Sequence, residues 1–158
     1  MLGVLEGLNK YAVRYDDQRY RGGAPYTDSA ATPLRKYGIK TIVSITPTEH
    51  ERDFCRKHGF AMVEIPFEKT KGPSQDDLRR YLGTIRTGVG PFDVHCHGGT
   101  HRGGVLGVAY RVHGLGWPYE KALVEHGRLA RIFHTLSSRN AAERRQGGLS
   151  GSFAAETV

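Results

Sequence analysis

The sequence predicts a single α/β domain with a central, largely parallel sheet that is flanked by helices. Segments typical of short strands alternate with segments typical of helices of ordinary length, which is the order found in parallel α/β folds. A β-branched run over 39–45 has the composition of a strand that is buried on both faces. The length of 158 residues fits one domain.

Local signals along the chain predict the individual elements. Gly38 and Gly59 each follow a helical segment, at the position where glycine commonly ends a helix. Residues 74–77 have the pattern of a capping box, and Pro118 has the position of a first helical residue. The expected elements, in chain order, are strands over 11–15 and 19–21, a helix from 27 or 29 to 37, a strand over 39–45, a helix over 47–58, a strand over 60–65, a helix over 74–87, a strand over 92–95, and helices over 103–113, 118–126 and 129–136.

The last part of the chain differs in composition from the rest. From Ser137 onward the apolar content falls, and Gly, Ser, Ala, Arg and Gln dominate. Such a segment buries too little apolar surface to offset the entropy of ordering it. We therefore expect a folded domain over 1–138 and a flexible basic tail over 139–158.

Charge and cysteine content narrow the classes of function. The formal net charge of +7 at pH 7 attracts anionic ligands, including phosphates, nucleic acids and acidic lipid headgroups. The chain has only two cysteines, Cys55 and Cys96, and this excludes a disulfide framework. We expect neither a signal peptide nor a membrane span, because no basic leader and no long apolar run occur. A reducing, cytoplasmic location is the resulting expectation.

The segment 93–104 carries the strongest functional signal. It reads Asp-Val-His-Cys-His-Gly-Gly-Thr-His-Arg-Gly-Gly, so a strand leads into Cys96, and Arg102 follows after five residues at the start of a helix. The N–H groups of such a loop and of the helix start point into one concavity, which suits an oxyanion. Gly98 and Gly99 let the backbone adopt conformations that other residues resist, and they let the oxyanion approach closely.

Arg102 and Cys96 add complementary chemistry to this loop. A guanidinium offers a planar fork for two phosphate oxygens, which a lysine does not match. The same positive field favours the thiolate form of Cys96, and a thiolate inside a phosphate cradle is a nucleophile for phosphoryl transfer. His97 and His101 enlarge the positive field when they are protonated. The segment therefore predicts a phosphate site with a cysteine nucleophile.

The sequence His95-Cys96, five residues and then Arg102 resembles the signature of the protein tyrosine and dual-specificity phosphatases. Further segments resemble the compact dual-specificity layout, so that the resemblance covers about residues 10–130: 19–25, 38–45, 65–66 and 110–123. The resemblance implies a phosphatase domain over 1–138. It also implies hydrolysis of phosphomonoesters through a phosphocysteine intermediate, with no cofactor and no metal.

The family pattern implies a role for each matching residue. Cys96 is the expected nucleophile, Arg102 is expected to bind the equatorial phosphate oxygens, and His95 is expected to support the cysteine. In the family an acid on an earlier loop, usually Asp, protonates the leaving group. That position falls near Glu68 or Lys69 here, and Glu68 is the candidate. The expected cradle is formed by the backbone amides of His97, Gly98, Gly99, Thr100, His101 and Arg102.

Two departures from the family pattern concern the second step and the acid. Gly103 stands where the family usually has Ser or Thr, whose hydroxyl eases departure of the thiolate. Phosphocysteine breakdown is therefore slow, or Thr100 supplies the hydroxyl instead. Asp76 and Asp77 lie near Glu68 in the sequence, but they stand at an expected helix start, where acidic residues stabilise the helix dipole.

Several alternatives remain open at this stage. The main expectation is hydrolysis of phosphotyrosine, phosphoserine or phosphothreonine in proteins. The competitors are a phosphatase of phosphoinositides, inositol phosphates or RNA 5′-phosphates, and a catalytically weak phosphate-binding pseudophosphatase. A zinc site at the loop histidines is disfavoured, because Arg102 would repel a cation and the spacing differs from common zinc sites. A nucleic-acid partner is not favoured, a monomer is expected, and Cys55 is expected to be structural.

Overall fold

The computed structural model describes residues 12–25 and 27–145. Its strands form one sheet in the spatial order β1-β2-β5-β3-β4. β1 pairs with β2 in antiparallel fashion, and the other neighbouring strands are parallel. The strands are β1 (Ala12–Asp16), β2 (Arg19–Gly23), β3 (Thr41–Ser44), β4 (Ala61–Glu64) and β5 (Phe92–Cys96). The predicted α/β class with a largely parallel sheet is confirmed.

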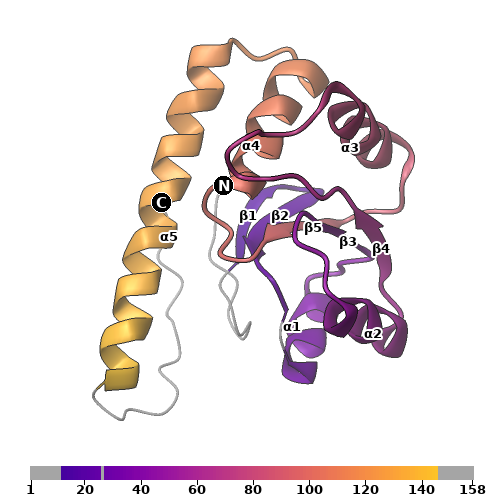
Figure 1. Ribbon diagram of the computed structural model, residues 1–158, viewed down its shortest axis with the longest axis vertical. Helices are drawn as coiled ribbons and strands as arrows, with labels where there is room; N and C mark the ends of the chain where they lie inside the picture. Colours follow the sequence, from indigo (N-terminus) through magenta and orange to yellow (C-terminus); the bar gives the residue numbers. More distant parts are fainter. Residues whose placement is uncertain (1–11, 26, 146–158) are drawn as a thin grey trace.

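Helices cover both faces of the sheet. α1 and α2 lie on one face, α3 and α4 lie on the other, and α5 runs beside the edge formed by β1 (Figure 1). The helical elements are the 3-10 turn η1 (Asp28–Ala30), α1 (Ala31–Lys36), α2 (Glu49–His58), α3 (Gln75–Thr87), α4 (Arg102–Ala109), the π-helical turn η2 (Tyr110–Gly114) and α5 (Tyr119–Arg145). Among the described residues, no helix is both long enough and apolar enough to cross a membrane.

The alternation of β3 divides the core into two layers. Ile42 packs with Leu34 and Phe54 on the side of α1 and α2. Val43, its neighbour along the strand, packs with Val94 and Leu106 on the side of α3 and α4. Because successive side chains of a strand point to opposite faces, a strand covered on both faces must be apolar throughout. This explains the β-branched run from which the buried strand was predicted.

The predicted helix ends are present. Gly59 ends α2 with φ of 74°, a left-handed conformation that suits glycine. At the start of α3, the Asp77 N–H donates to the Ser74 hydroxyl oxygen (3.1 Å), and the Ser74 N–H donates to the Asp77 carboxylate (2.8 Å). The capping box predicted over 74–77 is therefore confirmed.

The C-terminal helix differs from the sequence-based expectation. Two helices and a tail from residue 139 were expected, whereas α5 continues without a break to Arg145. Ala, Glu and Arg dominate 139–145 and all favour helix, and adding a turn to an existing helix avoids the cost of nucleation. The low apolar content of 139–145 thus did not predict their helical conformation. The rest of the predicted tail, 146–158, lies outside the described residues.

Candidate active site

The loop 96–102 lies at the carboxyl end of the central strand β5. β5 ends at Cys96, and α4 begins at Arg102. Parallel neighbours flank β5 on both sides, so the ends of β2 and β3 meet at the same edge of the sheet. This edge is where open α/β sheets commonly bind ligands. The first N–H groups of α4 lack partners within their own helix, so they are available to an anion at the loop.

The two adjacent glycines of the loop have different environments. Gly99 has φ of 77°, and a Cβ built on it would lie 2.6 Å from the backbone carbon of Gly22. A Cβ on Gly98 would have no atom within 4 Å. The two glycines are equivalent in the sequence pattern. The structure requires glycine at 99, both for the backbone conformation and for the close approach of β2, whereas Gly98 leaves open space.

Cys96 and Arg102 occupy opposite ends of the loop. Cys96 is 4% exposed and packs in the core layer under α3 and α4. Arg102 is partly buried, and its Nη1 donates a hydrogen bond to the Phe67 carbonyl oxygen (3.4 Å). The loop that precedes α3 therefore lies against the arginine. This contact brings the segment in which an acid was expected to the edge of the site.

A pocket of ≈ 250 Å³ opens beside the loop. It is bounded by the end of β2, the start of α2 and the loop itself, and Cys96 is not part of its lining. The residues that line it are Ala24, Pro25, Thr46, Thr48, Glu51, His97 and Arg102. Arginine and histidine on one wall and hydroxyl groups on another give the pocket the donors that a phosphoester requires.

Glu68 lies in the expected loop but away from the pocket. Its side chain is 66% exposed, and its carboxylate lies 3.3 Å from the Lys71 ammonium. Its neighbour Phe67 is the residue that contacts Arg102. The structure thus brings the backbone of this loop to the site, while the Glu68 carboxylate itself points to solvent and is not part of the pocket lining.

A buried polar cluster surrounds His95 on the face of the sheet opposite Cys96. Glu51, at the start of α2, lies with one oxygen 2.7 Å from His95 Nε2, and its other oxygen accepts a hydrogen bond from the Ser44 hydroxyl (2.9 Å). Burial alone would lower the pKa of His95, but Glu51 and Asp93 outweigh it and raise the pKa. Glu51 thus favours the protonated form of the imidazole that precedes Cys96 in the chain. Burial also raises the pKa of Asp93 to about 6.

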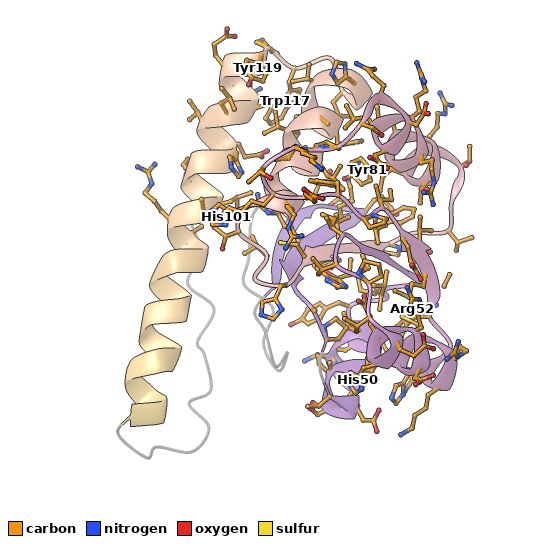
Figure 2. All side chains as sticks on the ribbon, viewed as in Figure 1. His50, Arg52, Tyr81, His101, Trp117 and Tyr119 are labelled. Carbon is orange, nitrogen blue, oxygen red and sulfur yellow. The ribbon has the colours of Figure 1, made fainter. Side chains whose placement is uncertain are left out.

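The three histidines around the loop, His95, His97 and His101, lie in different surroundings. His95 is fully buried and faces Glu51, whereas His97 lines the pocket and is exposed. Figure 2 shows His101 on the side of the loop that faces α5, where its charge lowers the pKa of His126. Within 12–25 and 27–145, no group of three or more metal-ligating side chains converges.

The family model described as "Polymorphic toxin system, DSP-PTPase phosphatase" matches residues 17–114. This match spans more than half of the chain and includes the whole loop 96–102. The chain belongs to this phosphatase family. It is therefore a cysteine-based hydrolase of the dual-specificity and tyrosine phosphatase group, as predicted, and a phosphoester substrate follows from the family. No match is found among curated proteins.

Three solved structures are similar to this family member in fold. P. aeruginosa TpbA, as a variant in complex with pTyr, is 21% identical with a TM-score of 0.65, covering 73% of this chain and 70% of TpbA. The Siw14 catalytic core is 15% identical with a TM-score of 0.63, covering 90% and 95%. PTPMT1 in complex with PI(5)P is 14% identical with a TM-score of 0.59, covering 81% and 97%. At these identities the likeness shows the dual-specificity phosphatase fold.

Two buried residues of this phosphatase that contact the loop or the histidine before its cysteine do not stand out in the sequence. Glu51 resembles an ordinary acidic residue in the first turn of a helix, and Arg21 resembles one member of an alternating strand. Both residues are 2% exposed. The available signal for Arg21 was the segment 19–25, which was noted for its resemblance to the family but was given no role.

Cys55 lies in the other core layer. It is 2% exposed and packs with the residues between α1, α2 and the sheet. Burial, with a contribution from Glu51 and Asp93, raises the pKa of its thiol to about 12. A protonated, enclosed thiol is unreactive, so its environment agrees with the structural role expected from the sequence.

Proposed function

We propose that this phosphatase hydrolyses phosphomonoesters of protein side chains through a phosphocysteine formed on Cys96. The observation that carries the proposal is the placement of a cysteine at the end of a central parallel strand, in a loop that closes with Arg102 at a helix start. Arg102 binds two equatorial oxygens of the phosphoryl group, and the loop amides donate hydrogen bonds to its negatively charged oxygens. His95, which precedes Cys96 in the chain, is buried and lies 2.7 Å from a Glu51 carboxylate oxygen.

The reaction proceeds in two displacements. The Cys96 thiolate attacks phosphorus, an S–P bond forms, and the P–O bond to the leaving group breaks while that oxygen takes a proton from an acid. Water then attacks the phosphocysteine and gives a proton to the conjugate base of that acid, the S–P bond breaks, and phosphate leaves with the thiolate and the acid regenerated. Because the phosphoryl group carries its charge throughout, most of the rate enhancement comes from the arginine and the oriented amides.

The central test compares wild type with Cys96→Ser. The wild type is expected to hydrolyse an aryl phosphate and phosphopeptides, and Cys96→Ser is expected to lose hydrolysis while it retains vanadate binding. Cys55→Ser is the matched control, because this second cysteine is enclosed in the other core layer. If alkylation of Cys96 left phosphoester hydrolysis unchanged, the mechanism would be refuted. Vanadate binding by a wild type without turnover would identify a phosphate-binding pseudophosphatase instead.

We further propose Glu68 as the general acid, reached by a movement of the loop that already contacts Arg102 through Phe67. Glu68→Gln is expected to slow the hydrolysis of alkyl phosphates by roughly 10²–10⁴-fold, and that of nitrophenyl phosphate far less, because nitrophenolate leaves without a proton. The measurement is kcat/KM for both substrates. Asp76→Asn is the control, since Asp76 is also an exposed acid paired with a nearby cation. Equal losses on both substrates would remove Glu68 from the mechanism.

A non-protein phosphate is the second candidate substrate. The pocket beside the loop extends to Pro25 and Thr48, beyond what a phosphate group alone occupies. The net charge of +7 favours ligands with several phosphates. The similar structures include one with pTyr and one with PI(5)P. Parallel assays with phosphopeptides, phosphoinositides, inositol phosphates and triphosphate-ended RNA, each with Cys96→Ser as the blank, decide between the two substrate classes.

A further inference from the structure

We propose that Arg21 of β2 is a positioning residue that holds the oxyanion cradle open before any ligand arrives. The ligand class, an oxyanion bound in the loop 96–102, is taken from the proposed function. Arg21 itself makes no contact with the ligand. It acts through the backbone of the loop, by fixing the direction of two peptide groups.

Arg21 makes direct contacts to the loop. Its side chain is buried in the space between β2 and α4, and the residue is 2% exposed. Nε donates a hydrogen bond to the Gly99 carbonyl oxygen (3.0 Å), and Nη2 donates one to the Thr100 carbonyl oxygen (2.5 Å). A single guanidinium therefore binds two successive carbonyl groups of the loop from outside, and it bridges residues far apart in the sequence.

Peptide geometry converts these contacts into orientation of the cradle. In a planar trans peptide the C=O and N–H of one unit point in opposite directions. Fixing the Gly99 carbonyl toward Arg21 directs the N–H of Thr100 away from Arg21. Fixing the Thr100 carbonyl in the same way directs the N–H of His101. These N–H groups belong to the amides expected to bind the phosphate oxygens. Arg21 therefore keeps two hydrogen-bond donors in a fixed direction, which a flexible loop would not do.

The register of the sheet explains why β2 supplies this residue. Gly22 and Gly23 stand beside His95 and Cys96 in the parallel pairing of β2 with β5, so Arg21 lies just before the point where β5 enters the loop. Gly99 contacts the backbone of Gly22, with no room for a Cβ on the loop. The segment Arg-Gly-Gly thus provides both the guanidinium and the bare backbone against which the loop rests.

A residue of α5 also contacts the Arg21 guanidinium. His126 Nδ1 lies 3.5 Å from Arg21 Nη1. The His126 ring also covers Gly104 of α4, where a Cβ would lie 2.1 Å from Cε1. Burial, together with the charges of Arg21 and His101, lowers the pKa of His126 and favours the neutral ring that accepts from a guanidinium. Arg21 is therefore fixed from both sides.

The test measures tungstate binding to the full chain by calorimetry, because tungstate requires no turnover. We expect Arg21→Ala to weaken binding by about tenfold or more, the usual effect of losing hydrogen bonds from a charged group. Amide hydrogen exchange at Thr100 and His101 is expected to accelerate in the same variant. Adding free guanidinium is expected to restore part of the affinity. Arg19→Ala is the matched control, since Arg19 is a buried arginine of the same strand that pairs with Asp16 and stacks on Tyr110.

The outcomes separate the positioning role from general damage. If Arg21→Ala does not fold, Arg21→Lys decides, because an ammonium cannot bind both carbonyls in the geometry of the fork. A folded Arg21→Lys with wild-type tungstate affinity and wild-type amide exchange would overturn the proposal, and so would equal weakening in Arg19→Ala. A wild type that binds tungstate without hydrolysing any phosphoester refutes the proposed function but leaves this test intact. A wild type that binds no tungstate overturns both.

Discussion

Gly103 lies directly after Arg102, in the first turn of α4, where the family usually has a hydroxyl residue. The structure has room for one, because a Cβ on Gly103 would meet its nearest neighbours, atoms of the Arg21 side chain, at 3.7 Å. The hydroxyl of Thr100, the expected substitute, is directed to the Gly98 carbonyl at 3.4 Å. At the residue scale, packing therefore does not require glycine at position 103, and the consequence of this residue is chemical.

Gly103→Ser is expected to raise the rate of phosphocysteine breakdown, because a hydroxyl beside the sulfur stabilises the departing thiolate. Serine also favours helix over glycine, so stability is not expected to fall. The measurement is the size of the initial burst of nitrophenol and the steady-state rate that follows it. The wild type is expected to show the larger burst relative to its steady-state rate. Gly103→Ala is the control without a hydroxyl. A similar acceleration in Gly103→Ala would contradict the role of the hydroxyl.

Asp93 gives a residue-scale prediction about pH. Its pKa is raised by burial from 3.8 to about 6, so between these values the native chain keeps a proton that the unfolded chain has released. Stability therefore falls as pH rises through this window. Asp93→Asn cannot titrate, and we expect it to gain stability relative to wild type by roughly 1–3 kcal/mol between pH 4 and pH 7.

Urea unfolding at a series of pH values measures this difference. Asp17→Asn serves as the control, because Asp17 is an exposed acid whose side chain is 93% accessible. A difference between wild type and Asp93→Asn that stays constant from pH 4 to pH 7 would show that Asp93 ionises normally in the native state.

At the scale of elements, the contact between β2 and the loop 96–102 is the least predictable feature of the site. Gly98 and Gly99 are indistinguishable in the sequence, but only Gly99 has a positive φ and abuts Gly22. The conformation of a glycine depends on the strand that approaches it, and that strand comes from a distant part of the chain. Helix ends, in contrast, were predicted correctly at Gly59 and Ser74, because their hydrogen bonds lie within a few residues.

Gly99→Ala is expected to destabilise the fold by roughly 1–3 kcal/mol, because a left-handed conformation and a backbone clash are combined. Gly98→Ala, the neighbouring control, is expected to cost less than about 1 kcal/mol, since its Cβ enters open space. Chemical denaturation without ligand measures both, so that obstruction of the phosphate site does not affect the comparison. The order of the two effects is the prediction, and its reversal would contradict the geometry.

At the scale of the whole molecule, α5 is attached along the β1 edge of the sheet. Leu129 is fully buried and packs against Val13 of β1. Arg111 of η2 binds both oxygens of Glu125 at 2.8 Å, and its guanidinium lies 4.4 Å from the centre of the Trp117 ring. Since His126 of the same helix supports Arg21, the attachment of α5 bears on the site as well as on stability.

Glu125→Ala is expected to cost roughly 1–3 kcal/mol, because the Arg111 guanidinium, only 7% exposed, loses its bidentate partner and keeps the Asp16 carboxylate at 3.6 Å. Glu120→Ala is the control, at the exposed start of the same helix. Thermal unfolding of the two variants measures the difference. A loss in Glu125→Ala no larger than that in Glu120→Ala would mean that the ion pair does not hold α5.

The sequence by itself determined the class of fold, the order of the elements and the position of the candidate site between Cys96 and Arg102. Each depends on neighbours along the chain: the β-branched run of β3, the caps of α2 and α3, and the spacing from Cys96 to Arg102. The tertiary structure decided which distant side chains support the loop. Arg21 and Glu51 reach residues 95–100 only because parallel pairing places β2 and β3 on either side of β5. Such contacts are fixed by register and burial, and no local pattern encodes them.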